Sequence, residues 1–173
     1  VFFITGSSRG IGNGIAKVLL SEGCRVIING RDVKYLEKEI KKLNKIYPDN
    51  IISVEGDVNK NIVTEEVINK SLEKWGHLDG IVANAGAVKS VPDWEINKDD
   101  WDWFFNNNFF VAYNAIQPLI PLLIKSRGSI VTIGSIAGLE DIGAPIPYAS
   151  AKAALLTYTK TLSNQLANKK IRV

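Results

Sequence analysis

Short runs of consecutive apolar residues, each followed by a stretch with helical periodicity, constrain the fold of this chain more than any other feature. The runs lie at 1–5, 25–29, 51–55, 79–83 and 129–133, and a further one begins at Ile171. Apolar residues at consecutive positions are typical of strands whose two faces are both covered by helices. The alternation predicts right-handed βαβ units in a doubly wound parallel sheet, an α/β fold of one domain over residues 1–173.

The helical stretches between these runs lie at 10–21, 32–46, 61–75, 98–124 and 148–168. Asp32 is placed to cap the first turn of the second stretch. The stretch from 98 to 124 is apolar almost all round, so we expect it to be buried on more than one side, with Pro118 and Pro121 bending or ending it. Three asparagines at 106–108 predict at least one inward-facing amide with hydrogen-bond partners.

A glycine-rich segment, residues 5–12, joins the first expected strand to the first helix. Its glycines suit a tight turn at Gly6, the approach of a bound group at Gly10 and close helix packing at Gly12. The helix N-terminus then presents free N–H groups and a positive dipole end to an anion. A bare turn would also use glycines, but the strand before and the helix after favour a dinucleotide-binding loop. The expected contacts are Gly6, Ser8, Arg9, Gly10, Ile11 and Gly12.

The end of the second expected strand bears on the choice of nucleotide. Gly30 stands where an NAD-dependent enzyme usually places a carboxylate for the ribose hydroxyls, and Arg31 follows it. Arg31 and Arg9 suit a 2′-phosphate, because guanidinium groups match phosphate geometry. The alternative is that Arg31 is only a solvated turn residue. The pattern favours NADP(H) over NAD(H).

Polar and small residues follow the other strands. Asp57 ends the third, where its carboxylate could meet an adenine amino group or only satisfy loop amides, and 84–86 (Asn-Ala-Gly) ends the fourth. Ligands of open parallel sheets bind outside the carboxyl ends of the strands. We therefore expect one site at this edge, formed by residues that end successive strands: Gly6, Arg31, Asp57, Asn84 and Ser135.

Tyr148 and Lys152 lie four residues apart, directly after Pro147. At i and i+4 of a helix their side chains lie on one face. A neighbouring ammonium group favours the phenolate, which makes tyrosine a better acid and base near neutral pH. Ser135, at the end of the fifth strand, could hold a substrate oxygen against the phenol. These residues predict a proton-transfer site beside the nucleotide site.

Taken in order, the motifs resemble the short-chain dehydrogenase/reductase family, in its shorter single-domain branch of 3-oxoacyl-[acyl-carrier-protein] reductase-like proteins. The resemblance covers nearly the whole chain and rests on Thr5-Gly-x3-Gly-x-Gly12, Asn84-Ala-Gly86, Asn108, Ser135 and Tyr148-x3-Lys152. It implies a Rossmann-type fold and an NAD(P)(H)-dependent oxidoreductase that interconverts a carbonyl and a secondary alcohol. The glycine spacing differs from that usual in the extended sugar-nucleotide epimerases.

The resemblance also implies roles for single residues. Tyr148 is the implied general acid/base, and Lys152 makes it more acidic and binds the nicotinamide ribose. Ser135 positions the substrate oxygen, and Asn108 holds a water that links Lys152 to solvent. Hydride would pass between nicotinamide and substrate while Tyr148 transfers the proton. Further implied cofactor contacts are Asp57, Val58, Asn84, Ala85, Gly86, Tyr148 and Lys152.

The family pattern continues beyond Val173 with a Pro-Gly segment, a lid over the substrate and a further strand. Since the chain opens and closes inside expected strands, we expect it to be incomplete at both ends, with the C-terminal part missing. The segments 87–97 and 139–147 flank the expected substrate pocket, and their mostly apolar side chains suit an acyl, steroid-like or sugar substrate about equally.

Composition excludes several classes. Charged residues make up 23% of the chain, and the basic ones are interspersed with acidic ones for a net charge of +3, which argues against a nucleic-acid partner. A single cysteine, Cys24, and a single histidine, His77, exclude an internal disulfide framework and argue against a metal site. No apolar run reaches the roughly 18 residues of a membrane span, and no signal peptide is visible, so we expect a cytoplasmic protein.

Two other functions remain open at this point. A non-catalytic NAD(P)-binding sensor or scaffold would keep the glycines but typically lose the tyrosine or lysine. An epimerase or dehydratase would use the same cofactor and tyrosine. The resemblance also implies a homodimer or homotetramer built from the helices at 98–124 and 148–168, and a small-molecule substrate.

Overall fold

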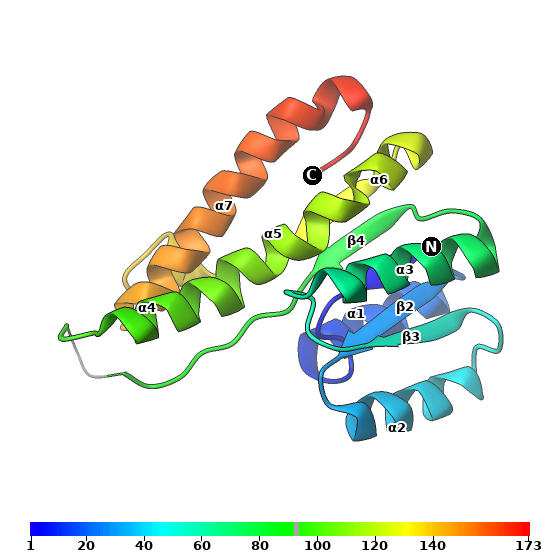
Figure 1. Ribbon diagram of the computed structural model, residues 1–173, viewed down its shortest axis with the longest axis horizontal. Helices are drawn as coiled ribbons and strands as arrows, with labels where there is room; N and C mark the ends of the chain where they lie inside the picture. The colour runs from blue at the N-terminus through cyan, green and yellow to red at the C-terminus, as the bar shows by residue number, and fades with distance from the viewer. Residues whose placement is uncertain (92–93) are drawn as a thin grey trace.

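The computed structural model describes residues 1–91 and 94–173 (Figure 1). At its centre lies a five-stranded sheet in the order β3-β2-β1-β4-β5, and every pairing in it is parallel. The predicted doubly wound parallel sheet is therefore confirmed. Arg172 adds an isolated parallel bridge to Ser129, where a sixth strand was expected to begin. The strands are β1 (Phe2–Ile4), β2 (Val26–Gly30), β3 (Ile51–Glu55), β4 (Gly80–Ala83) and β5 (Ser129–Thr132).

The first three helices agree closely with the periodicity. They are α1 (Gly10–Ser21), α2 (Val33–Asn44) and α3 (Asn61–Trp75). Asp32 caps α2 as predicted, since its carboxylate accepts hydrogen bonds from the backbone N–H groups of Lys34 (3.0 Å) and Tyr35 (3.3 Å). The last long helix, α7 (Ile146–Leu166), starts two residues earlier than expected, because Pro147 fits the first turn of a helix.

The stretch expected as one long helix is a series of five helical segments. They are α4 (Lys98–Phe105), a π-helical turn η1 (Asn106–Phe110), α5 (Val111–Ile116), a 3₁₀ turn η2 (Gln117–Leu119) and α6 (Ile120–Ser126). The α-helical pattern ends before Pro118, which lacks an N–H group, and resumes with Pro121 in the first turn of α6. The three asparagines open the π turn, and Asn108 is the one that points inward, with 1% of its surface exposed.

The series from Lys98 to Ser126 is long enough to cross a membrane, and an 18-residue window within it has a mean hydropathy of 1.2. The sequence predicted no membrane-spanning segment because only uninterrupted apolar runs were counted. Length and composition alone are weak evidence for a membrane span, because the core helices of soluble proteins meet the same criteria. Here Phe104, Ile116 and Leu119 are completely buried, and the series packs against both β4 and α7, as its apolar composition predicted.

Two apolar cores lie on the two faces of the sheet. Alternate residues of one strand enter different cores: in β1, Phe3 packs with the helices α3, α5 and α7, whereas Ile4 packs with α1 and α2. Consecutive strand residues are apolar for this reason. Figure 1 shows α7 running beside the α4–α6 series, with both beginning at the same end of the molecule.

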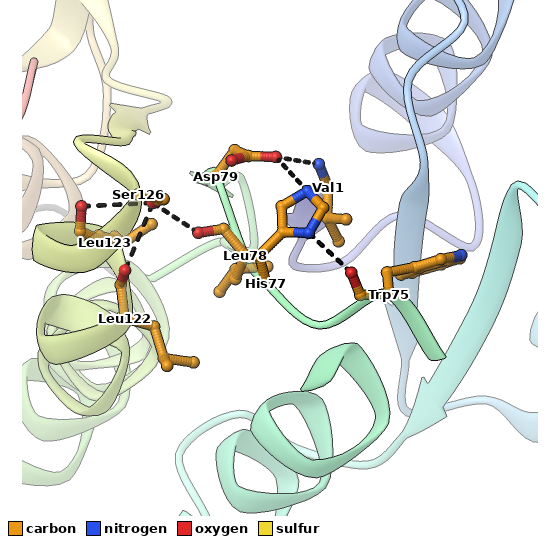
Figure 2. Close-up of polar contacts among 8 residues, drawn as sticks. All are labelled: Val1, Trp75, His77, Leu78, Asp79, Leu122, Leu123 and Ser126. Atoms are coloured by element: carbon orange, nitrogen blue, oxygen red, sulfur yellow. Dashed lines mark hydrogen bonds and ion pairs between the residues drawn. The ribbon is translucent and has the colours of Figure 1, made fainter. Parts of the chain in front are cut away.

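The single histidine lies at the amino ends of β1 and β4, away from the edge where the strands end (Figure 2). His77 lies 2.7 Å from the carbonyl oxygen of Trp75 and 3.2 Å from the carboxylate of Asp79. Ser126 donates to the carbonyl oxygen of Leu78 in the same region. His77 therefore lies in the loop between α3 and β4, as a loop residue at the surface.

Candidate active site

The glycine-rich loop between β1 and α1 needs its glycines for conformation and for space. Gly6 and Gly10 both adopt φ near +60°, a region that other residues rarely occupy. Gly12 is required for space, since a Cβ there would lie 2.5 Å from Nδ2 of Asn84 and 2.8 Å from the carbonyl oxygen of Gly6. No side chain of the described residues caps the N-terminus of α1, so no side chain satisfies its first N–H groups.

A buried asparagine, Asn29 in β2, fixes this loop to the sheet. Its Oδ1 accepts from the N–H of Gly6 (3.2 Å), and its Nδ2 donates to the carbonyl oxygens of Val54 and Gly56 (3.1 Å each). Its backbone exchanges two further bonds with Ser7. Sequence reasoning missed Asn29 and Ser7. The available signal was an amide inside an otherwise apolar buried strand, which must find hydrogen-bond partners.

Thr5 and Asn84 join the loop to the end of β4. The Thr5 hydroxyl accepts from the N–H groups of Asn84 (3.0 Å) and Ala85 (2.8 Å), and Thr5 is almost fully buried. The side-chain amide of Asn84 donates to the carbonyl oxygens of Thr5 and Gly6. The side-chain amide of Asn84 therefore stabilises the loop. The sequence predicted only that Asn84 contacts a cofactor.

A cleft of about 420 Å³ runs along the carboxyl ends of β1, β2, β3 and β4. Ten of the residues predicted to contact a cofactor line it: Gly6, Ser8, Arg9, Ile11, Arg31, Asp57, Val58, Asn84, Ala85 and Gly86. Four others do not line it: Gly10, Gly12, Tyr148 and Lys152. Asp57 also accepts a hydrogen bond from the N–H of Asn59 (3.0 Å), so its carboxylate satisfies a loop amide.

Two guanidinium groups border the cleft at the end of β2. Arg31 is exposed there, and Arg9 lies across the loop with its Cζ 5.5 Å from the ring centre of Tyr35. This distance is within the range of a cation–π contact, which holds the guanidinium near the cleft. The pair gives this end of the cleft a positive charge suited to a phosphate group.

The residues predicted for proton transfer lie at the start of α7 and the end of β5. Lys152 is 4% exposed, and its Nζ donates to the carbonyl oxygen of Ile133 at 2.8 Å. Burial lowers the pKa of Lys152 below its ordinary value, because the low-dielectric surroundings disfavour the charged form. The ring of Tyr148 packs edge to face on Phe104, with 6.4 Å between ring centres.

Ser135 begins a 3₁₀ turn, η3 (Ile136–Gly138), that packs against α7. Its Oγ accepts from the N–H of Ala137 at 3.2 Å, so its hydroxyl proton stays free to donate. A Cβ at Gly138 would lie 2.8 Å from the backbone nitrogen of Ala153. Gly138 thus permits the close approach of the Ser135 turn to α7, a requirement that the sequence did not reveal.

Asn108 is hydrogen-bonded to the segment that follows β4. Its Oδ1 accepts from the N–H of Ala87 (3.1 Å), and its Nδ2 donates to the carbonyl oxygens of Ala87 (2.7 Å) and Phe104 (3.0 Å). A Cβ at Gly86 would lie 3.1 Å from Oδ1 of Asn108 and 3.6 Å from Nζ of Lys152. Gly86 lines the cleft, so both side chains lie close to its boundary.

The two segments expected to flank a substrate pocket carry exposed apolar side chains near the beginnings of α4 and α7. Residues 92 and 93 of the first segment lie outside the described part of the chain. The exposed side chains include Val88, Trp94, Leu139, Ile142 and Ile146.

Known proteins resemble this chain over nearly its whole length. The family model for the short chain dehydrogenases matches residues 1–173. The 3-oxoacyl-[acyl-carrier-protein] reductase FabG of Chlamydia muridarum is 33% identical over 171 residues, which are 98% of this chain and 69% of that protein. FabG of Thermotoga maritima is 31% identical over an aligned length of 174, and the match covers 100% of this chain and 70% of that protein.

Solved structures give the same result. A short-chain dehydrogenase/reductase of unknown function from Caenorhabditis elegans, solved with cofactor, superposes with a TM-score of 0.90 at 32% identity. L-sorbose reductase from Gluconobacter frateurii, complexed with NADPH and L-sorbose, superposes with a TM-score of 0.91 at 26% identity. Each match covers 99% of this chain and 66% of the other. On this evidence the chain belongs to the short-chain dehydrogenase/reductase family, and its reductase relatives support an NAD(P)-dependent oxidoreductase.

Proposed function

We propose that this protein uses NADP(H) to interconvert a carbonyl group and a secondary alcohol. The observation that carries the proposal is the position of Gly86. This residue lines the cleft and also adjoins Asn108 and Lys152, so the cleft borders two of the groups proposed for proton transfer. Lys152 is kept at that place although it is 4% exposed and the burial of an ammonium group costs free energy.

The residues of the cleft fit NADP(H). Gly6 and Gly10 have the backbone conformation of a phosphate-binding loop, and the N-terminus of α1 offers free N–H groups. Arg9 and Arg31 would hold the 2′-phosphate, and Asp57 and the adjoining Val58 would border the adenine. When bound, the nicotinamide supplies or accepts the hydride.

The side chains of the protein would then transfer one proton and hold the substrate oxygen atom. Tyr148 is the proposed general acid in reduction and general base in oxidation, with its ring held by Phe104. The hydroxyl of Ser135 would donate to the substrate oxygen. Lys152 uses one N–H for Ile133, which leaves two for a ribose hydroxyl and for favouring the Tyr148 phenolate.

Asn108 is the proposed last member of this set. Both of its side-chain N–H groups already donate hydrogen bonds, so neither is available to a relay water. Such a water can be held by the second lone pair of Oδ1 or by a backbone carbonyl, beside Lys152. A cytoplasmic location and assembly into a dimer or tetramer are further parts of the proposal.

The test measures oxidation of NADPH by the purified protein with ketones, 3-oxoacyl thioesters and sugar-derived ketones. This panel covers different classes because the relatives are named as a 3-oxoacyl-[acyl-carrier-protein] reductase and an L-sorbose reductase. We expect turnover of at least one class. Tyr148→Phe should abolish that turnover and keep the wild-type affinity for NADPH. Tight NADPH binding with no turnover of any class, or full activity in Tyr148→Phe, would contradict the proposal.

A further inference from the structure

The segment that follows β4, residues 84–89, has no regular secondary structure, and its first residues line the cleft. Side chains from other elements hold its backbone in place. The hydroxyl of Thr5 accepts from two N–H groups in its first half. In its second half, the side-chain amide of Asn108 makes two hydrogen bonds with the backbone of Ala87, at 3.1 and 2.7 Å. The orientation of the Asn108 amide therefore depends on where this second half lies.

Lys89, two residues after Ala87, attaches the same segment to α4. Its Nζ lies 2.6 Å from Oδ1 of Asp100 and 4.8 Å from the ring centre of Trp103. Asp100 and Trp103 are three residues apart in α4, so they are neighbours on one face of the helix. The side chain of Asp100 is 18% exposed, and an ion pair that is partly shielded from water is stronger than a fully exposed one. One carboxylate and one aromatic face thus hold the Lys89 ammonium group.

We propose that Lys89 is a positioning residue for Asn108. The inference rests on the proposed function, in which Asn108 belongs to the proton-transfer set. Asn108 lies in the π turn that directly follows α4, so the ion pair of Lys89 and the hydrogen bonds of Asn108 join the same two stretches of chain at two places. Two attachments fix the direction of the segment, whereas one attachment at Ala87 would leave it free to turn.

The alternative is an ion pair that contributes only to the stability of the fold. A second ion pair on α4 has that character, since Nζ of Lys98 and Oδ2 of Asp102 are also 2.6 Å apart but both residues belong to the same helix. That pair attaches no other segment to α4. Lys98→Met is therefore the matched control for Lys89→Met. In both variants methionine replaces the charged side chain by a flexible apolar one of similar length.

The first experiment observes Asn108 directly, by NMR of its side-chain NH2 group without any nucleotide. Both of these N–H groups donate hydrogen bonds, so their protons should exchange slowly with water in the wild-type protein. Lys89→Met should raise the exchange rate about 3- to 30-fold, the change in a local opening equilibrium that corresponds to one partly exposed ion pair and one cation–π contact. Lys98→Met should leave the rate unchanged. An unchanged rate in Lys89→Met, or an equal rise in both variants, would overturn the proposal.

Two further variants separate the loss of the attachment from the charge that it leaves behind. Removal of the Lys89 ammonium group leaves the Asp100 carboxylate without its cation, which is itself unfavourable for α4. Lys89→Met with Asp100→Asn removes this charge but does not restore the attachment, so Asn108 should exchange as fast as in Lys89→Met. Lys89→Arg keeps the charge and the aromatic contact and should restore the wild-type rate. A wild-type rate in the double variant, or a rate in Lys89→Arg as high as in Lys89→Met, would refute the positioning role.

The second experiment measures steady-state kinetics on the best carbonyl substrate and the affinity for NADPH. In Lys89→Met, kcat should fall about 3- to 10-fold, because displacements below 1 Å already reduce rates at an active site. The affinity for NADPH should not change, since Lys89 does not line the cleft. Lys89→Arg and Lys98→Met should keep the wild-type kcat. A wild-type kcat in Lys89→Met would contradict the proposal.

The two experiments separate the inference from the function on which it rests. If the wild-type protein reduces no carbonyl compound, the proposed function fails, while the NMR series still decides whether Lys89 holds Asn108 in place. If the wild-type protein is active but Asn108 exchanges at the same rate in Lys89→Met, only the inference about Lys89 is overturned.

Discussion

The substitution Gly138→Ala tests the view that a backbone contact places Ser135 against α7. The added Cβ would lie 2.8 Å from the nitrogen of Ala153 and 2.9 Å from the carbonyl carbon of Lys152. Ordinary contact begins at 3.4 Å, so the turn must retreat from α7 by about 0.6 Å. Both obstructing atoms belong to the backbone of α7, which cannot yield as a side chain does.

A displacement of this size should act mainly on the chemical step. A misplacement of about 1 Å in an active site can reduce the rate on the order of 100-fold, so we expect kcat to fall roughly 10- to 100-fold. Gly138 does not line the cleft proposed to bind the nucleotide, so the affinity for NADPH should stay at the wild-type value. Stability should fall by about 1–3 kcal/mol, the usual cost of overpacking.

The assay combines steady-state kinetics on the best carbonyl substrate with calorimetric titration of NADPH and thermal unfolding. Gly134→Ala is the matched control on the other side of Ser135. Its Cβ would meet only the end of the flexible Leu156 side chain, at 2.9 Å, so the loss of kcat should be much smaller. Wild-type kcat in Gly138→Ala, or equal losses in both variants, would refute the reasoning.

Three further predictions address the cofactor, the buried lysine and assembly. Arg31→Ala should weaken NADPH binding and leave NADH binding unchanged; equal effects on both would remove Arg31 as the phosphate contact. Because burial lowers the pKa of Lys152, the folded state binds fewer protons than the unfolded state just below the ordinary value of 10.5. Stability should therefore rise with pH through that window in wild type but not in Lys152→Met, as measured by denaturant unfolding across pH. Phe110 and Tyr113, 42% and 40% exposed on the α4–α6 series, should be covered in a dimer or tetramer, and sedimentation velocity showing a monomer at micromolar concentration would contradict this.

The sequence predicted the fold well because its signals are local. Apolar residues at consecutive strand positions require two covered faces, and β1 shows how Phe3 and Ile4 satisfy that requirement in two different cores. The bounds of α1 and α3 and the cap at Asp32 also agree with the prediction, because caps and periodicity depend on neighbouring residues. The long helix was predicted less well, since the change to a π turn at the three asparagines leaves no periodic signal.

The candidate site was also predicted only in part from the sequence. The sequence by itself determined which residues end the strands, and therefore which side chains gather at one edge of a parallel sheet. Only the tertiary structure decided how close those groups come. Gly30 against Ser8, Gly86 against Asn108 and Lys152, and Gly138 against α7 are contacts between segments far apart in the chain. Spacing along a sequence carries no information about such approaches, because they depend on how the elements pack.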